Sequence, residues 1–327
     1  MSRVVVFDRF GGPEVLRVVD EEPAAPRSGE VRIQIEAAAV NPIDILSRSG
    51  TSPAHVALPH ARLGVEATGV VEAVGPETSG FHVGDPVIVT AIPDFVARGS
   101  YADRLTVPSS VLILRPPQLT VPQAAASWVA FSTAYGALVG AAGTRPGDRV
   151  VVSGASGAVG RAAIQVARLV GAVPIALTRR RNGVAPLETA GAAAVVVTDA
   201  GNPADAIRAA TDGEGADIVL DLVRGPGQAD LIEATRRGGV VVAAGFLDPR
   251  PTPPSRRDDV TLVGYRGFET LADKEAVDRM AAFFVAGVEK QALLPRIDRE
   301  FPLAEAVEAH RHYESGRNRG GKVVLRP

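Results

Sequence analysis

The chain has 327 residues, of which 46% are hydrophobic and 22% charged, so it is long enough for two domains with sizeable cores. A formal net charge of −2 at pH 7 gives no global basic field and argues against a primary role in binding nucleic acid or an anionic membrane. The chain contains no Cys, which excludes disulfides, thiolate catalysis and cysteine-ligated zinc.

The N-terminal apolar run Val4–Phe7 is too short for a signal peptide, and no segment approaches the roughly 20 apolar residues of a membrane span. We therefore expect a cytoplasmic protein with no membrane partner. The five His residues form no recognisable set of metal ligands. His310 and His312 are two positions apart, so on a helix they face different directions, and we expect both at the surface.

Residues 1 to about 120 contain short β-like runs separated by Gly and Pro. This irregular all-β pattern favours a compact barrel-like domain over a parallel sheet. The expected strands are Val4–Phe7, Leu16–Val19, Val31–Val40, Gly69–Val74, Pro86–Val89 and Ser100–Val107.

From about Val121 the pattern changes to alternating helices and strands, and six apolar segments with helical stretches between them predict a doubly wound parallel sheet. The expected strands are Val150–Ser153, Val173–Leu177, Ala194–Val197, Ile218–Leu222, Val240–Ala244 and Thr261–Gly264. The expected helices are Pro122–Ala141, Val159–Val170, Ala185–Ala190, Pro203–Thr211, Gly227–Thr235 and Ala272–Gly287. The tail from about Gln291 returns to β character.

The first of these strands leads into a glycine-rich turn and then a helix. The spacing Ala155-x-Gly157-x-x-Gly160 differs from G-x-G-x-x-G only at its first position. Glycines allow the backbone to approach phosphate oxygens, and the helix N-terminus offers unpaired N–H groups. We expect a dinucleotide's pyrophosphate here, held by Ser153, Ala155, Ser156, Gly157, Ala158, Val159 and Gly160. A purely structural strand-to-helix turn is the alternative.

The second strand indicates which dinucleotide binds. An acidic residue about 20 positions after the glycines would hydrogen-bond the ribose 2′-OH of NAD. The chain instead reads Thr178-Arg179-Arg180-Arg181. Because a guanidinium matches phosphate geometry, Arg179 and Arg181 are candidates to bind the adenosine 2′-phosphate of NADP. Thr178, directly before them, is a further candidate cofactor-binding residue. The alternative is a solvated basic loop.

Several motifs together resemble the zinc-free, quinone oxidoreductase-like branch of the medium-chain dehydrogenase/reductase superfamily over nearly the whole chain. They are Asn41-Pro42-Ile43-Asp44, Arg48-Ser49-Gly50, the run 63–75 containing Gly64-Val65-Glu66, Val83–Val87, Gly99–Asp103, Gly147-Asp148, Asp217–Asp221, Arg237-Gly238-Gly239 and Gly321–Leu325. The resemblance implies a GroES-like β-barrel catalytic domain over 1–122, a Rossmann NADP-binding domain over 123–262 and a C-terminal segment, 263–327, that returns to the catalytic domain.

The resemblance also implies how the site is built. The zinc-dependent branch has a Cys near Asn41 and a Gly-His-Glu where this chain has Gly64-Val65-Glu66, so both metal ligands are missing and we expect no metal. Asn41 and Asp44 would hydrogen-bond the nicotinamide ribose or the acceptor oxygen; the alternative is a local turn organised by Pro42.

Other implied site residues lie further along the chain. Thr133 would lie beside the nicotinamide, or its hydroxyl would simply bond back within its helix. Gly245 and Phe246 would lie on the nicotinamide side of the sheet edge. Asn318 would help to hold the cofactor, and Glu66 could act as a buried polar anchor. Leu46 replaces a Tyr common in the family, which leaves no obvious proton donor besides solvent.

The resulting functional expectation is an NADPH-dependent reductase that transfers hydride to a quinone or an α,β-unsaturated carbonyl compound without a metal. A specialised enoyl or alkenal reductase, or a tailoring enzyme of a biosynthetic pathway, would use the same residues. A catalytically idle NADPH-binding structural protein is the alternative outside enzymes. The family resemblance also implies a homodimer and a small-molecule substrate.

Overall fold

The computed structural model describes residues 1–52, 55–90, 92, 94–270, 273–316 and 320–327. The chain forms two compact units. Unit 1 comprises Met1–Val129 and Leu294–Pro327, and unit 2 comprises Ala130–Leu293. Unit 1 is therefore built from both ends of the chain, whereas unit 2 is one continuous segment.

Unit 1 is organised around a seven-stranded sheet with the order β15-β16-β3-β5-β6-β8, in which β7 also pairs with β3. A smaller sheet has the order β2-β1-β4. The strands are β1 (Ser2–Phe7), β2 (Arg17–Glu21), β3 (Glu30–Ala39), β4 (Ala61–Arg62), β5 (Ala67–Val74), β6 (Pro86–Val89), β7 (Arg104–Pro108), β8 (Leu112–Leu114), β15 (Ile297–Pro302) and β16 (Lys322–Arg326).

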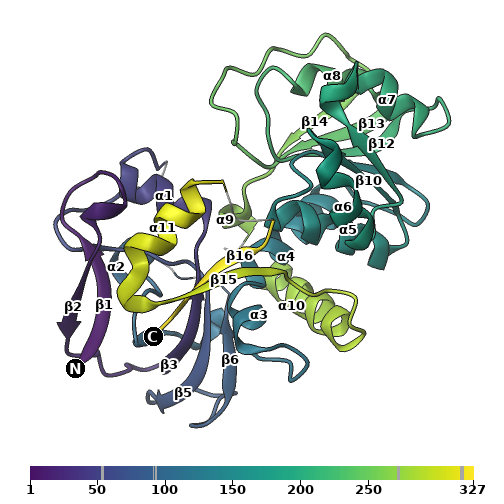
Figure 1. The fold of residues 1–327 in the computed structure, drawn as a ribbon. Coiled ribbons are helices and arrows are strands. Elements are labelled where there is room, and N and C mark those ends of the chain that lie inside the picture. Colours follow the sequence, from purple (N-terminus) through teal and green to yellow (C-terminus); the bar gives the residue numbers. More distant parts are fainter. Residues whose placement is uncertain (53–54, 91, 93, 271–272, 317–319) are drawn as a thin grey trace. The chain divides into compact units, whose positions relative to one another are not determined.

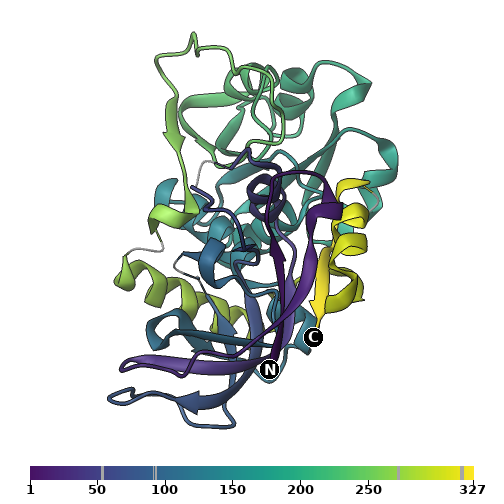
Figure 2. The same ribbon diagram turned by 90° about the vertical axis from the view of Figure 1, so that its left-hand side faces the viewer.

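The last strand of the chain, β16, lies inside the large sheet of unit 1. It pairs in parallel with β15 and antiparallel with β3. Val323, Val324 and Leu325 are fully buried there. In Figures 1 and 2 the yellow C-terminal elements lie beside the purple N-terminal ones, consistent with contacts between helix α11 (Ala306–Glu314) and residues Pro13–Val15.

The helices of unit 1 are short. They are η1 (Pro13–Val15), α1 (Pro42–Ser49), α2 (Phe95–Arg98), η2 (Ser109–Val111), α3 (Val121–Ala125), η6 (Leu303–Glu305) and α11 (Ala306–Glu314). Helix α1 begins at the N-cap residue Asn41 with Pro42 in its first turn, where the missing N–H of Pro leaves no bond unmade. It ends at Gly50, whose φ of +79° is a left-handed conformation suited to Gly.

Unit 2 contains a six-stranded, all-parallel sheet with the order β11-β10-β9-β12-β13-β14 (Figure 1). The strands are β9 (Arg149–Val152), β10 (Val173–Thr178), β11 (Ala194–Val197), β12 (Ala216–Asp221), β13 (Thr235–Ala243) and β14 (Thr261–Gly264). Each overlaps one of the six apolar segments, so the predicted doubly wound sheet is confirmed. Chain order reverses between β9 and β12, which makes the carboxyl ends of these strands the expected ligand crevice of such a sheet.

The helices of unit 2 pack on this sheet or beside it. They are α4 (Trp128–Tyr135, which begins in unit 1), the π-helical η3 (Gly136–Ala141), α5 (Ala158–Val170), η4 (Arg181–Gly183), α6 (Val184–Thr189), η5 (Thr198–Ala200), α7 (Pro203–Ala209), α8 (Gln228–Glu233), α9 (Gly267–Thr270) and α10 (Lys274–Glu289). No helix in the described part of the chain is long and apolar enough to cross a membrane.

The single helix expected over Pro122–Ala141 is wrong, because the segment divides into α3, α4 and η3. After α3, the Ser127 hydroxyl donates to the carbonyl of Ala124. The π-helical stretch begins at Gly136, where a Cβ would lie 1.9 Å from the Tyr265 hydroxyl oxygen. A distant side chain therefore occupies the space that a regular helix with a larger residue would need.

The chain returns to unit 1 at Leu294, later than the expected position 263. Helix α10 explains the difference, because it packs against α4 within unit 2. The rings of Phe131 and Phe284 are 5.6 Å apart, and those of Tyr135 and Phe283 are 4.8 Å apart. The functional domain boundaries themselves stay a prediction.

Candidate functional site

In unit 2, the turn between β9 and α5 places several backbone groups at the carboxyl edge of the sheet. Gly154 adopts a φ of +59°, and the N–H of Gly157 donates to the carbonyl of Gly154 at 3.0 Å. Ser156 and Gly157 are exposed, whereas Ala155 is buried. Helix α5 then starts at Ala158, so its first N–H groups have no acceptor within the helix. This geometry is suited to an anion.

The two motif glycines of this turn have different roles. A Cβ on Gly160 would lie 2.5 Å from both the Gly154 carbonyl oxygen and the Cα of Ala155, which the fold cannot accommodate. A Cβ on Gly157 would meet only the Gly154 oxygen, at 3.3 Å. Gly160 is therefore required by packing of the turn, whereas Gly157 leaves its outer face open.

Asp221, at the end of β12, holds the neighbouring loop against the turn. Its Oδ1 accepts from the Ser153 hydroxyl at 2.7 Å and from the N–H groups of Val223 and Arg224, and its Oδ2 accepts from Gln228 at 2.9 Å. The Ser153 oxygen in turn accepts from the N–H of Leu222. The buried Ser153 hydroxyl is thus used within the protein.

The end of β10 presents the expected basic cluster. Thr178 is buried, and its hydroxyl donates weakly to the Arg180 carbonyl at 3.4 Å. Arg179, Arg180 and Arg181 are exposed, and no carboxylate pairs with them in the part of the chain that the structure describes. These guanidinium groups therefore remain available to an external anion.

Gly245 and Phe246 follow β13 at the same edge of the sheet. A Cβ on Gly245 would lie 1.8 Å from the Leu222 carbonyl oxygen, so the close approach of these two strand ends requires Gly. Phe246 is 55% exposed. The adjacent Leu247 side chain lies close to Gly154, because a Cβ added to Gly154 would lie 3.9 Å from Leu247 Cδ1. The two predicted residues thus lie near the glycine-rich turn.

Thr133 lies within α4, half-buried. A Cβ on Gly267 would lie 3.6 Å from its hydroxyl oxygen, which places α9 beside it. Its role next to a nicotinamide stays a prediction. Asn318 lies outside the described residues.

In unit 1, Asn41 and Asp44 form the N-terminal cap of α1. Asp44 Oδ2 accepts from the Asn41 backbone N–H at 2.8 Å and from the Tyr101 hydroxyl at 3.0 Å. Its Oδ1 accepts from the N–H of Gly64 at 2.8 Å. Burial raises the pKa of Asp44 to about 6, against the opposing effects of these hydrogen bonds and the charge of Lys322. Asp44 thus joins α1 to the Gly64 turn and to Tyr101.

Asn41 belongs to a second buried network. Its Nδ2 donates to the Ala39 carbonyl and to Glu66 Oε1, and its Oδ1 accepts from Lys322 Nζ. Asn41 is 1% exposed and Asp44 fully buried, so within unit 1 both act by holding structure. Direct contact of either residue with a ligand stays a prediction.

The expectation that His310 and His312 lie at the surface is wrong for His310. This residue is fully buried between Arg48 and Tyr101: its Nδ1 lies 3.3 Å from Arg48 Nη1, and its ring meets the Tyr101 ring edge-on at 5.8 Å. It lies on the inner face of α11. His312 is partly buried and contacts Asp298 at 2.6 Å.

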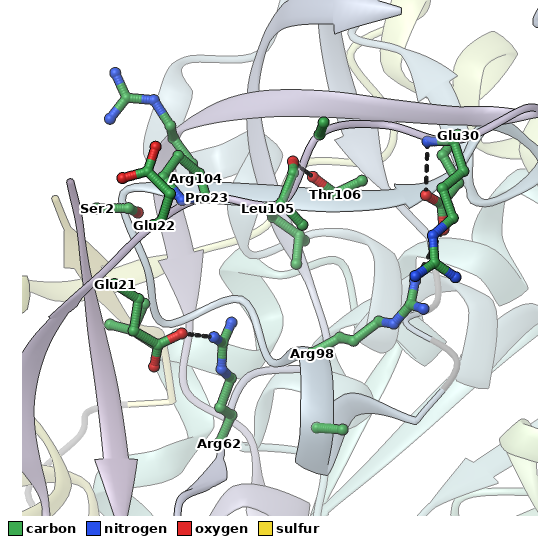
Figure 3. A pocket seen from close by; sticks show the side chains of 15 residues that line it. Ser2, Glu21, Glu22, Pro23, Glu30, Arg62, Arg98, Arg104, Leu105 and Thr106 are labelled. Carbon is green, nitrogen blue, oxygen red and sulfur yellow. Dashed lines mark hydrogen bonds and ion pairs between the residues drawn. The ribbon is translucent and has the colours of Figure 1, made fainter. Parts of the chain in front are cut away.

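A separate surface pocket of about 300 Å³ in unit 1 is lined by residues of β1, β2, α2 and β7 (Figure 3). Two ion pairs lie within its lining: Arg62 contacts Glu21, and Arg98 Nη1 lies 3.0 Å from Glu30 Oε1. No predicted site residue lines it. In the described ranges, no group of three or more His, Cys, Asp or Glu residues could hold a metal ion.

Sequence reasoning did not assign roles to Asp221 and Lys322. For Asp221 the available signal was an acidic residue closing an apolar strand, a position where a carboxylate can organise the next loop. For Lys322 it was a lone charge before the apolar run Val323–Leu325. Neither signal reveals the partner, which is distant in the sequence.

Comparison with known proteins supports this architecture. Residues 27–117 match the family model for an alcohol dehydrogenase GroES-like domain, and residues 190–325 match the one described as zinc-binding dehydrogenase. Human quinone oxidoreductase is 31% identical over 331 residues, covering 99% of this chain and 97% of the relative.

Two solved structures illustrate the similarity of fold. An NAD-dependent alcohol dehydrogenase is 31% identical, with a TM-score of 0.88 and 99% of each chain covered. Escherichia coli quinone oxidoreductase, solved with NADPH, is 24% identical, with a TM-score of 0.90 and 100% of each chain covered; this likeness concerns the fold.

A GroES-like domain combined with a six-stranded parallel sheet defines the class of medium-chain dehydrogenases and reductases, which are oxidoreductases. Within that superfamily the chain belongs to the quinone oxidoreductase-like family. The resemblance found in the sequence and its fold class are thereby confirmed.

Proposed function

We propose that the chain transfers hydride from NADPH to a quinone or an α,β-unsaturated carbonyl compound, without a metal ion. The observation that best supports this proposal is the exposed cluster Arg179–Arg181, which has no carboxylate partner within the described residues. The cluster follows β10, which pairs with β9, the strand that leads into the glycine-rich turn. The names of related proteins include both NAD and NADPH, so the cofactor choice rests on these arginines.

The residues of unit 2 fit a dinucleotide. The backbone of 153–160 would hold the pyrophosphate, because the turn is open at Gly157 and the helix N-terminus lies behind it. Arg179 and Arg181 would hold the 2′-phosphate, and Gly245 and Phe246 would lie along the nicotinamide side. When bound, NADPH supplies the hydride, with its two electrons, and the acceptor takes one further proton from solvent.

The metal-free part of the proposal rests on the sequence and on the surroundings of Glu66. Asn41 and Val65 occupy the positions of the zinc branch's ligands, and Val65 cannot coordinate a metal. The Asn41 amide and the Glu66 carboxylate are both engaged by the Lys322 ammonium. Without a Lewis acid to stabilise an alkoxide, an acceptor that is already electrophilic suits the site better than an alcohol.

The test is NADPH oxidation by purified protein with a panel of quinones, alkenals and enoyl thioesters, with and without a chelator. We expect turnover of at least one of these acceptors, no effect of the chelator and zinc content well below one per chain. The reverse arm offers NADP⁺ with primary and secondary alcohols. Oxidation of alcohols that a chelator abolishes would overturn the proposal. Tight NADPH binding without turnover of any acceptor would instead support a binding protein.

A further inference from the structure

Unit 1 contains a buried ion pair between Glu66 and Lys322. Lys322 Nζ lies 2.6 Å from Glu66 Oε1. The Lys322 side chain is 6% exposed and the Glu66 side chain 1% exposed. Glu66 immediately precedes β5, and Lys322 is the first residue of β16; both strands pair with β3. Removing two charges from water costs several kcal/mol per ion, so such a pair needs further hydrogen bonds around it.

Asn41 provides part of this surrounding network. Its Oδ1 accepts from Lys322 Nζ at 2.5 Å, and its Nδ2 donates to Glu66 Oε1 at 3.0 Å. An ammonium can only donate and an ionised carboxylate can only accept. A flipped Asn41 amide would turn its NH₂ toward the ammonium and its oxygen toward the carboxylate. The ion pair therefore permits one amide orientation.

The same carboxylate reaches the start of α4. Glu66 Oε2 accepts from the backbone N–H of Val129 at 2.9 Å, and Val129 is the second residue of that helix. N–H groups in a first helical turn have no acceptor within the helix, and a negative charge is favourable there. Thr133 lies on this helix about one turn further on. The carboxylate of the ion pair thus anchors the first turn of this helix.

We propose that Lys322 is a positioning residue, whose ammonium fixes the Asn41 amide and holds Glu66 against the first turn of α4. This inference rests on the proposed function, with Asn41 and Thr133 in the roles that the family resemblance implies for them. Only three of the 35 basic residues are Lys, and the other two, Lys274 and Lys290, are exposed. A compact ammonium with three donors can serve two close acceptors in a space too small for a planar guanidinium.

The experiment compares Lys322→Met, Glu66→Gln and the double variant, with Lys274→Met as the matched exposed control. Unfolding in urea is followed by the fluorescence of Trp128, the only Trp in the chain. The NMR signal of the Asn41 side-chain amide, identified by its loss in Asn41→Asp, reports the amide environment. Steady-state kinetics with NADPH give kcat and KM separately.

We expect each single variant to lower the urea midpoint and the double variant to recover most of that loss, because neither member of the pair is then left buried without the other. The Asn41 amide signal should shift in all three. The kcat should fall about 10- to 100-fold in all three, including the double variant, with little change in KM for NADPH. Lys274→Met should change none of these quantities.

Two results would overturn the inference. One is a double variant that regains both its stability and its kcat, because the pair would then serve the fold alone. The other is an unshifted Asn41 amide signal in Lys322→Met. If the wild-type chain turns over no acceptor, the proposed function fails instead, and the amide signal still decides whether Lys322 fixes Asn41.

Discussion

The arginine side chains that follow β10 differ electrostatically from many other arginines in the described part of the chain. Arg32 and Arg104, for example, share the carboxylate of Glu72. The cluster Arg179–Arg181 is exposed and lacks such a partner in the described ranges. Adjacent like charges repel, and a bound phosphate would relieve that repulsion while accepting charge-assisted hydrogen bonds.

The double change Arg179→Ala/Arg181→Ala should therefore reduce the preference for NADPH. Each charge-assisted bond contributes roughly 1.5–3 kcal/mol, so losing one should weaken NADPH binding about 10- to 100-fold. Binding of NADH and turnover at saturating cofactor should hardly change, because the nicotinamide end is untouched. Titration of the protein with NADPH and with NADH measures both affinities. The control is Arg237→Ala, because Arg237 is exposed and lies near the start of β13, away from the carboxyl ends of the strands. A wild type that prefers NADH, or a double variant that keeps its NADPH preference, would refute the assignment.

His310 predicts a pH effect on stability. Burial, followed by the charge of Arg48, lowers the pKa of His310 to about 3. In the unfolded chain the pKa is about 6.5, so below that pH the unfolded state binds a proton that the folded state does not. The stabilisation is complete above pH 6.5 and is lost progressively as the pH falls toward 3.

Relative to His310→Gln, the wild type should lose about 1.6 kcal/mol of unfolding free energy between pH 6.5 and pH 5. Urea unfolding followed by Trp128 fluorescence at both pH values measures this difference. Asp44 and the other titrating groups are common to both proteins, so the comparison isolates His310. A pH-independent difference between wild type and variant would show that the pKa of His310 is the same in the folded and unfolded states, which would contradict the effect of burial.

The limits of sequence reasoning at this scale follow from distance along the chain. The residues of the glycine-rich turn are contiguous, so their spacing alone predicts their geometry. His310 contacts Arg48, and Lys322 contacts Glu66, across more than 200 residues. Such pairs depend on how strands of unit 1 are ordered, which hydrophobic periodicity does not specify. Lys322 therefore appears in the sequence as part of the motif Gly321–Leu325, with no indication of its partner.

At the scale of elements, the turn between β9 and α5 offers a matched pair of substitutions. Gly160→Ala should disrupt the turn, because its Cβ would meet Gly154 O and Ala155 Cα at 2.5 Å. Gly157→Ala should be accommodated, because it meets only one atom at 3.3 Å and its φ is −73°. We expect NADPH affinity to fall more than about tenfold in the first variant and to change less than about threefold in the second.

A third substitution separates packing from charge in this turn. Gly157→Asp should weaken NADPH binding while the fold survives, since a carboxylate there would repel the pyrophosphate. Calorimetric titration gives the affinities, and circular dichroism checks the fold. Equal affinities for the wild type and all three variants would mean that the pyrophosphate does not bind at this turn.

The strands of unit 2 were predictable because each is a short apolar run between turn signals, and a parallel sheet buries both faces. The breaks between α3, α4 and η3 were not, because the sequence 122–141 is mostly apolar and its few weak helix formers, such as Ser127 and Gly136, do not by themselves specify where a helix ends. At Gly136, where the π-helical stretch begins, the Tyr265 hydroxyl lies so close that a Cβ would not fit, and this contact depends on the tertiary fold. Local propensity thus predicted helical structure here but not where the regular helix ends.

At the scale of the whole molecule, the two units differ in how they depend on the chain ends. Unit 2 is continuous from Ala130 to Leu293 and has its own apolar core around Val151, Ile175 and Val219. Unit 1 is complete only when the C-terminal segment returns to it. The β character of the tail suggested a return, but its starting point is set by the packing of α10 in unit 2.

This asymmetry predicts the effect of shortening the chain to end at Gly316. The change removes β16 from between β15 and β3, together with three fully buried apolar side chains. Burial of each such side chain contributes about 1.5–3 kcal/mol. Their sum is comparable to the total unfolding free energy of a typical domain, about 5–15 kcal/mol. Unit 1 should fail to fold, and Trp128 emission should shift to the red as that side chain meets water. Unit 2 should retain NADPH affinity within about threefold, because it holds the proposed phosphate-binding residues and needs no strand from the tail.

A chain ending at Arg326, which keeps β16 intact, is the control and should behave as wild type. Loss of NADPH binding in the shorter chain would mean that unit 2 needs unit 1 to fold, and a native Trp128 emission would mean that unit 1 does not need its last strand.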